Sequence, residues 1–427
     1  MAGSRAHGVL RSPEGNLLRE VVSLYIRIVE IKQSFKYELK QDPGQQRSMY
    51  RFAGCRRRVF NMGLGLQMAN YEAGERYIRY ESMAKNLGTW RRNSGTVWLS
   101  EAPFHTLQQA LKDLDRAYKN FFAQRANFPT FKKKGRGDSF RFPDPKQIKL
   151  DQANSRIFLP KLGSVHYRNS RKVLGDLKNV TVSLSAGKWF ISIQTAREVE
   201  KPVARGEAIG IDLGIVRFAT LSDGTVYNPP NIFKRYAPSL RKAQQAMSRK
   251  KKFSSNWKKA KAKVQRIHVR NANARRDYLH KASTAISKNH AMVFVEDLKV
   301  SNMSRSAAGT IEQPGKNVKQ KAGLNRSILD QGWAEFRRQL EYKLLWAGGQ
   351  CVAVPAMNTS RTFPECHHIS GDNRRSQAIF CCVECGFSEN ADLVAAKNIL
   401  RAGFARLACQ VNCEVSSQQQ EPTERAA

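Results

Sequence analysis

The sequence predicts a multi-domain protein of mixed α+β class, on three observations. Its 427 residues exceed the size of one ordinary domain. Helical periodicity between residues 46 and 128 gives way to short alternating runs, which are typical of an antiparallel sheet or a small barrel. Beyond residue 208, short and wholly apolar runs are separated by long helical segments, as in a sheet that helices cover on both faces.

The chain begins with an extension, a strand and a helical region. Residues 1–33 place apolar side chains at helical spacing, and we assign this extension no role. Residues 34–39 alternate like a strand, and Asp42-Pro43-Gly44 then turns the chain into the helical region. One helix of that region carries an apolar stripe, which we interpret as bundle core: Phe104, Leu107, Leu111, Leu114 and Tyr118.

Four short strands are predicted after the Pro129–Gly137 segment, at 139–142, 156–159, 180–184 and 189–195. The segment itself carries a cluster of cations beside Phe131 and Phe140. It is either a loop that grips phosphates while its rings stack on bases, or an ordinary solvated loop. The cations are Lys132, Lys133, Lys134 and Arg136.

A second sheet is predicted in the last two hundred residues. Its apolar strands lie at 209–214, 291–295 and 350–354, with a hairpin signal at Asp223-Gly224. Helices are expected at 331–346 and 390–400, and the polar tail from residue 405 onward is predicted to be disordered.

The charge of the chain indicates a polyanionic partner. It has 73 Lys and Arg against 35 Asp and Glu, a net charge of +38. The excess runs along the whole chain, which favours nucleic acid over a membrane surface. No segment is apolar enough to cross a membrane, so a cytoplasmic location is expected.

Residues 241–288 concentrate this charge, with 16 Lys and Arg and the single acid Asp277. The stretch lacks Pro and Gly, and it predicts a phosphate-facing helix pair rather than a solvated face. Its predicted nucleic-acid contacts are Lys250, Lys251, Lys252, Lys258 and Lys259.

Three acids stand where buried elements end: Asp212, Glu296 and Asp392. Phosphodiester hydrolysis with two Mg²⁺ ions needs carboxylates that converge from separate elements. Each acid alone could be a turn or helix-capping residue. Together they predict a magnesium site, because buried acids without metal or cationic partners are costly.

These motifs, in order, resemble the TnpB (OrfB) family of insertion-sequence-encoded RNA-guided nucleases, which are related to the miniature type V CRISPR effectors. The resemblance covers residues 34–404. The specific motifs are Gly210-Ile-Asp-Leu-Gly214, Val295-Glu-Asp-Leu298, a cysteine knuckle, and Glu389-Asn-Ala-Asp392 followed by Ala395-Ala-Lys-Asn-Ile-Leu400. Further matches are 55–61, 129–132 with 139–142, and 324–330 with Trp333.

The resemblance implies an RNase H-like (RuvC) nuclease domain, an OB-like β-barrel wedge domain, a helical recognition lobe and a zinc-finger-like knuckle that binds target nucleic acid. The implied ranges are 34–45 and 129–204 (wedge), 46–128 (lobe), 205–361 (nuclease, first two motifs and basic helices), 362–388 (knuckle) and 389–404 (third motif), between the extension 1–33 and the tail 405–427.

It also implies a prokaryotic, nucleoid-associated endonuclease that uses a guide RNA from the element's end to cut double-stranded target DNA beside a short flanking motif. The three acids fall on the family's catalytic carboxylates. Three rival functions are considered. A CRISPR-associated effector has the same chemistry with a guide from another source. A non-cutting RNA-guided repressor should have lost these acids. A strand-transferring transposase would need a tyrosine nucleophile site, which spacing does not identify.

Two positions depart from the family pattern. Val394 stands where Asn is common, and Phe363 stands where a zinc ligand is expected. Four of the eight cysteines lie within twenty residues, which indicates a metal site in a reducing compartment. Zinc held by Cys366, Cys382, Cys385 and His368 is one interpretation. The other is a metal-free knuckle in which Phe363 packs against Phe380 and the thiols are free.

Overall fold

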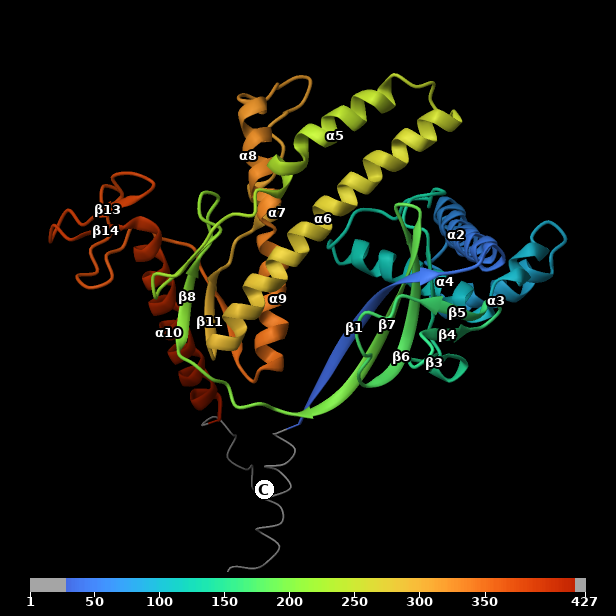
Figure 1. Ribbon diagram of the computed structural model, residues 1–427, viewed down its shortest axis with the longest axis horizontal. Coiled ribbons are helices and arrows are strands. Elements are labelled where there is room, and N and C mark those ends of the chain that lie inside the picture. The colour runs from blue at the N-terminus through green and yellow to red at the C-terminus, as the bar shows by residue number, and fades with distance from the viewer. Residues whose placement is uncertain (1–27, 419–427) are drawn as a thin grey trace, which may run out of the picture. The chain divides into compact units, whose positions relative to one another are not determined.

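The computed structural model describes residues 28–418, with side chains up to residue 409 (Figure 1). The chain folds as two compact units that divide between Val199 and Glu200. The structure is of the mixed α+β class that the sequence predicts.

The first unit contains a seven-stranded sheet in the order β2-β6-β7-β1-β5-β4-β3. Its first strand comes from the start of the described chain, whereas the others follow the helices, so the helical region is an insertion into the sheet. The strands are β1 (Ile28–Lys40), β2 (Ser139–Phe142), β3 (Lys149–Asp151), β4 (Arg156–Leu159), β5 (Gly163–Tyr167), β6 (Asp176–Ser185) and β7 (Lys188–Glu200).

The inserted helices are α2 (Pro43–Glu72), α3 (Tyr80–Arg92) and α4 (Phe104–Phe122), with a 3-10 turn at Val97–Glu101. Asp42 starts α2 through a capping box with Gln45, and Pro43 stands at its first turn, where a missing N–H costs nothing. The predicted stripe on α4 is largely confirmed as core, because Leu107, Leu111 and Leu114 are buried.

Several strand predictions need correction. β1 begins at Ile28, inside the predicted extension, while residues 1–27 lie outside the described residues. β3 and β5 were not predicted, because three to five residues with at most two buried side chains give too short an alternation to recognise. β6 and β7 extend past the predicted ends, since backbone pairing continues through polar residues such as Ser185 and Lys188.

The second unit contains a five-stranded sheet in the order β10-β9-β8-β11-β12. β8, β11 and β12 are parallel, and β9 and β10 are added antiparallel. The strands are β8 (Ala208–Asp212), β9 (Ala219–Leu221), β10 (Val226–Tyr227), β11 (Met292–Glu296) and β12 (Gln350–Val354). The predicted Asp223-Gly224 hairpin connects β9 and β10.

Helices cover both faces of this sheet, as the apolar strands predicted. On one face Phe294 packs with Ile399 of α10, and on the other Val293 and Val295 pack with Phe336 of α9. The helices are α5 (Ile232–Ser248), α6 (Ser255–Asn289), α7 (Val300–Met303), α8 (Val318–Gln331), α9 (Trp333–Trp346) and α10 (Ala391–Gln418). A two-stranded hairpin, β13 (Ile379–Cys381) and β14 (Ser388–Asn390), precedes α10.

Two helix boundaries differ from the prediction. The predicted helix 331–346 starts after Gly332, whose φ of +75° separates α8 from α9. The last helix does not stop at residue 400 but continues to Gln418, so the predicted disordered tail is wrong for residues 405–418. Leu407 extends the apolar face of α10 onto the cluster around Phe294, which explains why the helix continues at least to that residue. Residues 419–427 lie outside the described chain.

No helix among residues 28–418 combines the length and apolarity that a membrane crossing requires.

Candidate active site

The sheet of the second unit places two of the three acids side by side. β8 and β11 are parallel, with Ile211 opposite Val295. Asp212 and Glu296 are the next residues and the last of their strands. The carboxyl ends of two neighbouring parallel strands therefore present two carboxylates at one edge of the sheet.

The third acid reaches this edge because α10 packs very closely on β8. A Cβ atom at Gly210 would lie 2.2 Å from the backbone oxygen of Ala396 and 2.6 Å from the amide nitrogen of Leu400. Only glycine permits this approach. It sets the first turn of α10, with Asp392, beside the end of β8.

The electrostatics show that the three acids interact. Burial, followed by the nearby carboxylates of Glu296 and Asp392, raises the pKa of Asp212 to about 7, although the Arg374 guanidinium opposes the rise. Burial also raises the pKa of Glu296, against a hydrogen bond from Thr359 and the charge of Arg374. A cation bound here would relieve this repulsion.

Glu296 and Asp297 are adjacent acids with different environments. The Glu296 carboxylate is largely buried and accepts a hydrogen bond of 2.6 Å from Thr359 Oγ1. The Asp297 side chain is 51% exposed and pairs with Arg337 at 2.5 Å. The structure therefore assigns Glu296, and not Asp297, to the acid cluster.

Sequence analysis did not identify the residues that position these acids. Besides Thr359, Arg217 donates to Asn390 at 3.1 Å and lies 3.9 Å from the Asp392 carboxylate. Asn398 donates to the carbonyl oxygens of Thr359 and Thr362, which ties the start of the knuckle to α10. Asn398 lies within the family-like motif after Asp392, but Arg217, Thr359 and Arg374 carry no local signal.

The knuckle brings three cysteines together. The sulfur atoms of Cys366, Cys382 and Cys385 all lie within 4.8 Å of one another, with Cys366 and Cys382 3.6 Å apart. Tetrahedral zinc with bonds of about 2.3 Å would hold sulfurs about 3.8 Å apart, so this set fits zinc. Within the described residues, His368 is not part of the group.

The packing predicted for a metal-free knuckle is also present. Phe363 is buried and stacks on Phe380 with ring centroids 6.1 Å apart, and it contacts Phe387 at 4.6 Å. Phe363 thus fills the position of the missing ligand with an apolar contact. The two interpretations are compatible, because the aromatic packing leaves the three sulfurs gathered.

The predicted basic loop is anchored to α2. Asn61 exchanges two hydrogen bonds with the backbone of Lys132, and Lys132 Nζ lies 4.7 Å from the centroid of the Phe60 ring. Phe131 is 48% exposed, whereas Phe140 is buried in the core and cannot stack on a base, which corrects that part of the prediction. The remaining cations of the loop, Lys133, Lys134 and Arg136, are exposed.

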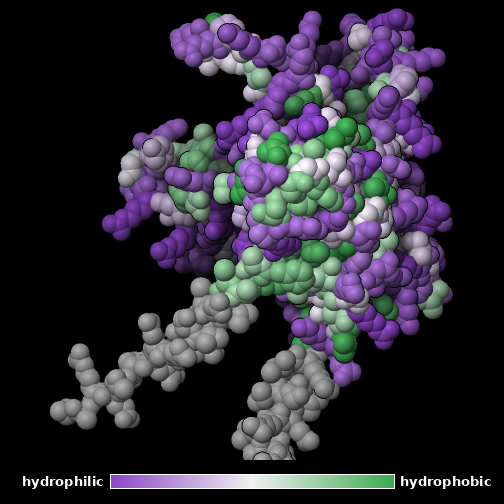
Figure 2. Space-filling model, turned by 90° about the vertical axis from the view of Figure 1, so that its left-hand side faces the viewer, coloured by the Kyte–Doolittle hydropathy of each residue, from purple (hydrophilic) through white to green (hydrophobic). Residues whose placement is uncertain are grey.

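The predicted basic helix pair is present as α5 and α6, joined by residues 249–254 (Figure 1). Two of its sixteen cations form ion pairs with described carboxylates, Arg275 with Asp330 and Lys281 with Asp277. The five predicted contact residues are exposed: Lys250, Lys251, Lys252, Lys258 and Lys259. Hydrophilic residues also predominate on the molecular face in Figure 2.

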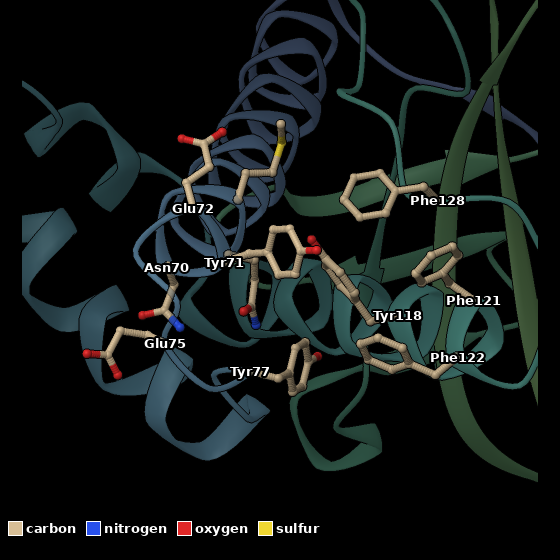
Figure 3. A pocket seen from close by; sticks show the side chains of 11 residues that line it. Asn70, Tyr71, Glu72, Glu75, Tyr77, Tyr118, Phe121, Phe122 and Phe128 are labelled. Atoms are coloured by element: carbon tan, nitrogen blue, oxygen red, sulfur yellow. The ribbon is translucent and has the colours of Figure 1, made fainter.

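An aromatic pocket in the first unit was not predicted. Rings from α2, α4 and the segments next to them surround it, and Glu72 and Glu75 stand at its rim (Figure 3). None of the three acids of the second unit takes part in it. The rings are those of Tyr71, Tyr77, Tyr118, Phe121, Phe122 and Phe128.

Three family models match the chain. The model described as "Probable transposase" (OrfB of IS605) matches residues 188–307, the "Cas12f1-like, TNB domain" matches residues 333–399, and a "Helix-turn-helix domain" of the same OrfB family matches residues 31–76. Among solved structures, the complex titled "Cryo-EM structure of the Cas12f1-sgRNA-target DNA complex" is 12% identical, with a TM-score of 0.48, covering 87% of this chain and 99% of that one.

Two curated relatives are similar over most of their length. "Putative RNA-guided DNA endonuclease InsQ" of Escherichia coli (strain K12) is 56% identical over 394 residues, which are 92% of this chain and 98% of the relative. "Putative RNA-guided DNA endonuclease" of Streptomyces pristinaespiralis is 33% identical over 387 residues, 89% and 91% of the two chains. The chain belongs to the TnpB (OrfB, IS605) family.

Proposed function

We propose that this protein is an RNA-guided DNA endonuclease that hydrolyses phosphodiester bonds of double-stranded target DNA beside a short flanking motif. The convergence of Asp212, Glu296 and Asp392 from β8, β11 and α10 is the observation that carries the proposal. The activity in the names of the two relatives, which are similar over nearly the whole chain, agrees with it. A mixed five-stranded sheet with these acids at its edge supports an RNase H-like nuclease domain.

The donor set fits magnesium. Carboxylate oxygens are the ligands that Mg²⁺ prefers, and the raised pKa of Asp212 reflects first its burial and then the charges of Glu296 and Asp392. Bound Mg²⁺ would activate water and stabilise the leaving oxygen. The chain's own contribution is to fix the carboxylates: Thr359 orients Glu296, and Arg217 lies beside Asp392.

Zinc is the second proposed cofactor, with a structural role. Cys366, Cys382 and Cys385 supply three thiolates in suitable positions. The His368 side chain would have to turn towards them to complete a four-ligand set. Because structural zinc stabilises the folded state, we expect it to hold the knuckle on the start of α10.

Guide RNA and target DNA are the proposed partners, held through their phosphates. Residues 241–288 of the α5–α6 hairpin hold sixteen cations, and fourteen of them have no described ion pair. Base pairing by the guide would read the target sequence, while the protein reads duplex shape and the flanking motif. These residues would contact the phosphates of a guide from an insertion-sequence end and of one from a CRISPR array in the same way.

A cleavage assay tests the proposal. Asp212→Asn, Glu296→Gln and Asp392→Asn should each reduce magnesium-dependent cleavage of target DNA at least a hundredfold, and guide-RNA binding should stay near that of the wild type. Asp297→Asn is the matched control, because its carboxylate pairs with Arg337 outside the cluster. Cleavage by Glu296→Gln at the rate of Asp297→Asn would refute the assignment. Loss of cutting without loss of binding would also separate an endonuclease from a non-cutting repressor.

A further inference from the structure

The tip of the hairpin of α5 and α6, residues 249–254, exposes an aromatic ring in an unfavourable backbone conformation. Phe253 is 67% exposed and has a φ of +70°. This left-handed region is strongly disfavoured for bulky residues and is normally occupied by Gly or Asn. The turn does require it, since the Ser254 amide donates to the Lys251 carbonyl and the Ser254 side chain then caps α6. Glycine would satisfy the same turn without cost.

Packing does not explain why phenylalanine stands there. Phe253 precedes the helix cap and touches Trp257 edge to face, with centroids 5.5 Å apart. A hydrophobic staple would instead pair it with the fourth helical residue, which is Lys258. However, the two helices are held together by a separate apolar cluster of Leu240, Ala243 and Val264. A ring that is two-thirds exposed contributes little to that packing.

The surroundings of the ring suit an anionic, aromatic ligand. Lys252 Nζ lies 5.4 Å from the centroid of the Phe253 ring, and Lys261 Nζ lies 5.1 Å from that of Trp257. Lys250 and Lys251 are exposed on the same turn. The tip thus combines an open ring with cations that have no described carboxylate partner. This is the combination that binds single-stranded nucleic acid, because bases stack on rings while phosphates contact lysines.

We propose that the tip of this hairpin binds one unpaired nucleotide, with its base stacked on Phe253 and its phosphates held by Lys250–Lys252. The proposal rests on the proposed function, in which Lys250–Lys252 already contact phosphates, and adds to it a stacking site on Phe253 for an unpaired base. The strand is either an unpaired part of the guide RNA or the non-target DNA strand that the guide displaces. A paired base inside a duplex offers no free face for such stacking.

Binding of short oligonucleotides to the full-length protein tests it. The RNA-free protein is titrated with an unstructured RNA 12-mer, and the guide-loaded protein with a DNA 12-mer of the same sequence. Phe253→Leu keeps an apolar side chain but removes the ring. It should weaken binding about 5- to 100-fold in the titration, with RNA or with DNA, whose strand provides the stacked base. Phe253→Trp should retain wild-type affinity. Phe122→Leu, another exposed ring, in a pocket that Glu72 and Glu75 also line, is the matched control and should change neither arm.

Two further readouts separate stacking from a structural or purely electrostatic role. Phe253→Leu should leave the slope of log affinity against log salt unchanged, because no charge is lost, whereas Lys251→Gln should reduce it by about 0.7. Phe253→Gly should raise the melting temperature and still lose affinity, because it relieves the backbone conformation and removes the ring.

Equal affinities of wild type and Phe253→Leu in both arms would overturn the proposal. A lower melting temperature for Phe253→Gly, with wild-type affinity for Phe253→Leu, would assign the ring to helix capping instead. In either case the cleavage assay of the acid variants decides the proposed function separately. Absence of any RNA binding by the wild type would refute both the stacking site and the proposed RNA-guided function.

Discussion

At the scale of single residues, the site depends on acids whose charge opposes folding. Asp212 is held in a buried position next to two other carboxylates, and its pKa is raised to about 7. Neutralising it should therefore stabilise the magnesium-free protein although it abolishes the proposed activity. Such a trade between stability and function is expected at an active site.

This yields a pH-dependent prediction for Asp212→Asn. Between the unfolded pKa of about 4 and the folded pKa of about 7, the folded state holds a proton that the unfolded state has released. The wild type therefore loses stability as the pH rises through this window, by up to about 1.4 kcal/mol per pH unit, whereas an asparagine does not titrate. In EDTA the melting temperature of Asp212→Asn should exceed that of the wild type by several degrees at pH 8 and by little at pH 5.

Asp297→Asn, whose native carboxylate is half exposed, serves as the control and should show no such divergence. Adding Mg²⁺ at pH 8 should raise the melting temperature of the wild type more than that of Asp212→Asn, because ligands that bind the folded state stabilise it. Parallel melting curves of wild type and Asp212→Asn across pH 5–8 would contradict the account of Asp212.

At the scale of elements, the site depends on the contact between α10 and β8 and on the knuckle before α10. Gly210 of β8 lets the backbone of α10 touch the strand. Further along α10, Gly403 lets the helix approach β11, because a Cβ there would lie 2.1 Å from the Phe294 ring. The knuckle is held to the same helix by Asn398. One helix thus supplies an acid, covers the sheet and anchors the cysteine cluster.

Gly210→Ala should displace α10. Its new Cβ would approach the Ala396 carbonyl to 2.2 Å, so the helix must move away from the strand. We expect a loss of about 1–3 kcal/mol, which corresponds to roughly 3–10 °C in melting temperature, together with a marked loss of cleavage. Gly323→Ala on α8 is the control, because nothing lies within 4 Å of its Cβ, and it should stabilise slightly. Equal melting temperatures for the two variants would disprove this role of Gly210.

The knuckle should contain about one zinc ion per chain. Elemental analysis of protein purified without chelator measures this, and Cys382→Ser should remove the metal and lower the melting temperature by several degrees. Cys381→Ser is the neighbouring control and should keep the zinc, because Cys381 lies outside the sulfur cluster. Loss of zinc in His368→Ala would identify the fourth ligand. A wild-type protein without zinc and with full cleavage activity would instead favour the metal-free knuckle.

At the scale of the whole molecule, we expect the net charge of +38 to contribute more to the affinity for nucleic acid than any single contact does. The positive charge of a lysine is offset only where a carboxylate lies within ion-pair distance of it. Lys281 pairs with Asp277 at 2.7 Å, whereas no described carboxylate lies within ion-pair distance of Lys258 or Lys259. All three lysines lie on α6, so replacing the paired or the unpaired ones changes the charge of the same helix and allows the effects on binding to be compared.

Neutralising the unpaired lysines should weaken RNA binding more than neutralising the paired one. Lys258→Gln with Lys259→Gln should flatten the plot of log affinity against log salt by about 0.7–0.9 for each lost phosphate contact. Lys281→Gln should change the slope little, because Asp277 already offsets its charge. Fluorescence anisotropy from 50 to 300 mM salt measures both, and equal slopes in all variants would mean that α6 is only a solvated face.

The sequence by itself determined the class of the protein and the family resemblance, and it predicted the three acids. These properties depend on local patterns: apolar runs that end at Asp212 and Glu296, a helix that begins near Asp392, and charge that accumulates between residues 241 and 288. The strands β2 and β4 were predicted at their observed bounds for the same reason. Each pattern extends over fewer than about fifty residues, so the chain reveals it without folding.

Only the tertiary structure decided which neighbours complete the site. Glu296 was predicted from the sequence, but only the structure shows how it differs from Asp297: Glu296 ends β11 beside the end of β8, whereas Asp297 pairs with Arg337. Thr359, Arg217 and Arg374 approach the acids from segments that are distant in the chain, and Phe140 turns out to be core. The raised pKa of Asp212 and the left-handed backbone of Phe253 likewise arise from packing and turn geometry. They depend on distances between residues far apart in sequence and on local φ angles, which composition and periodicity do not encode.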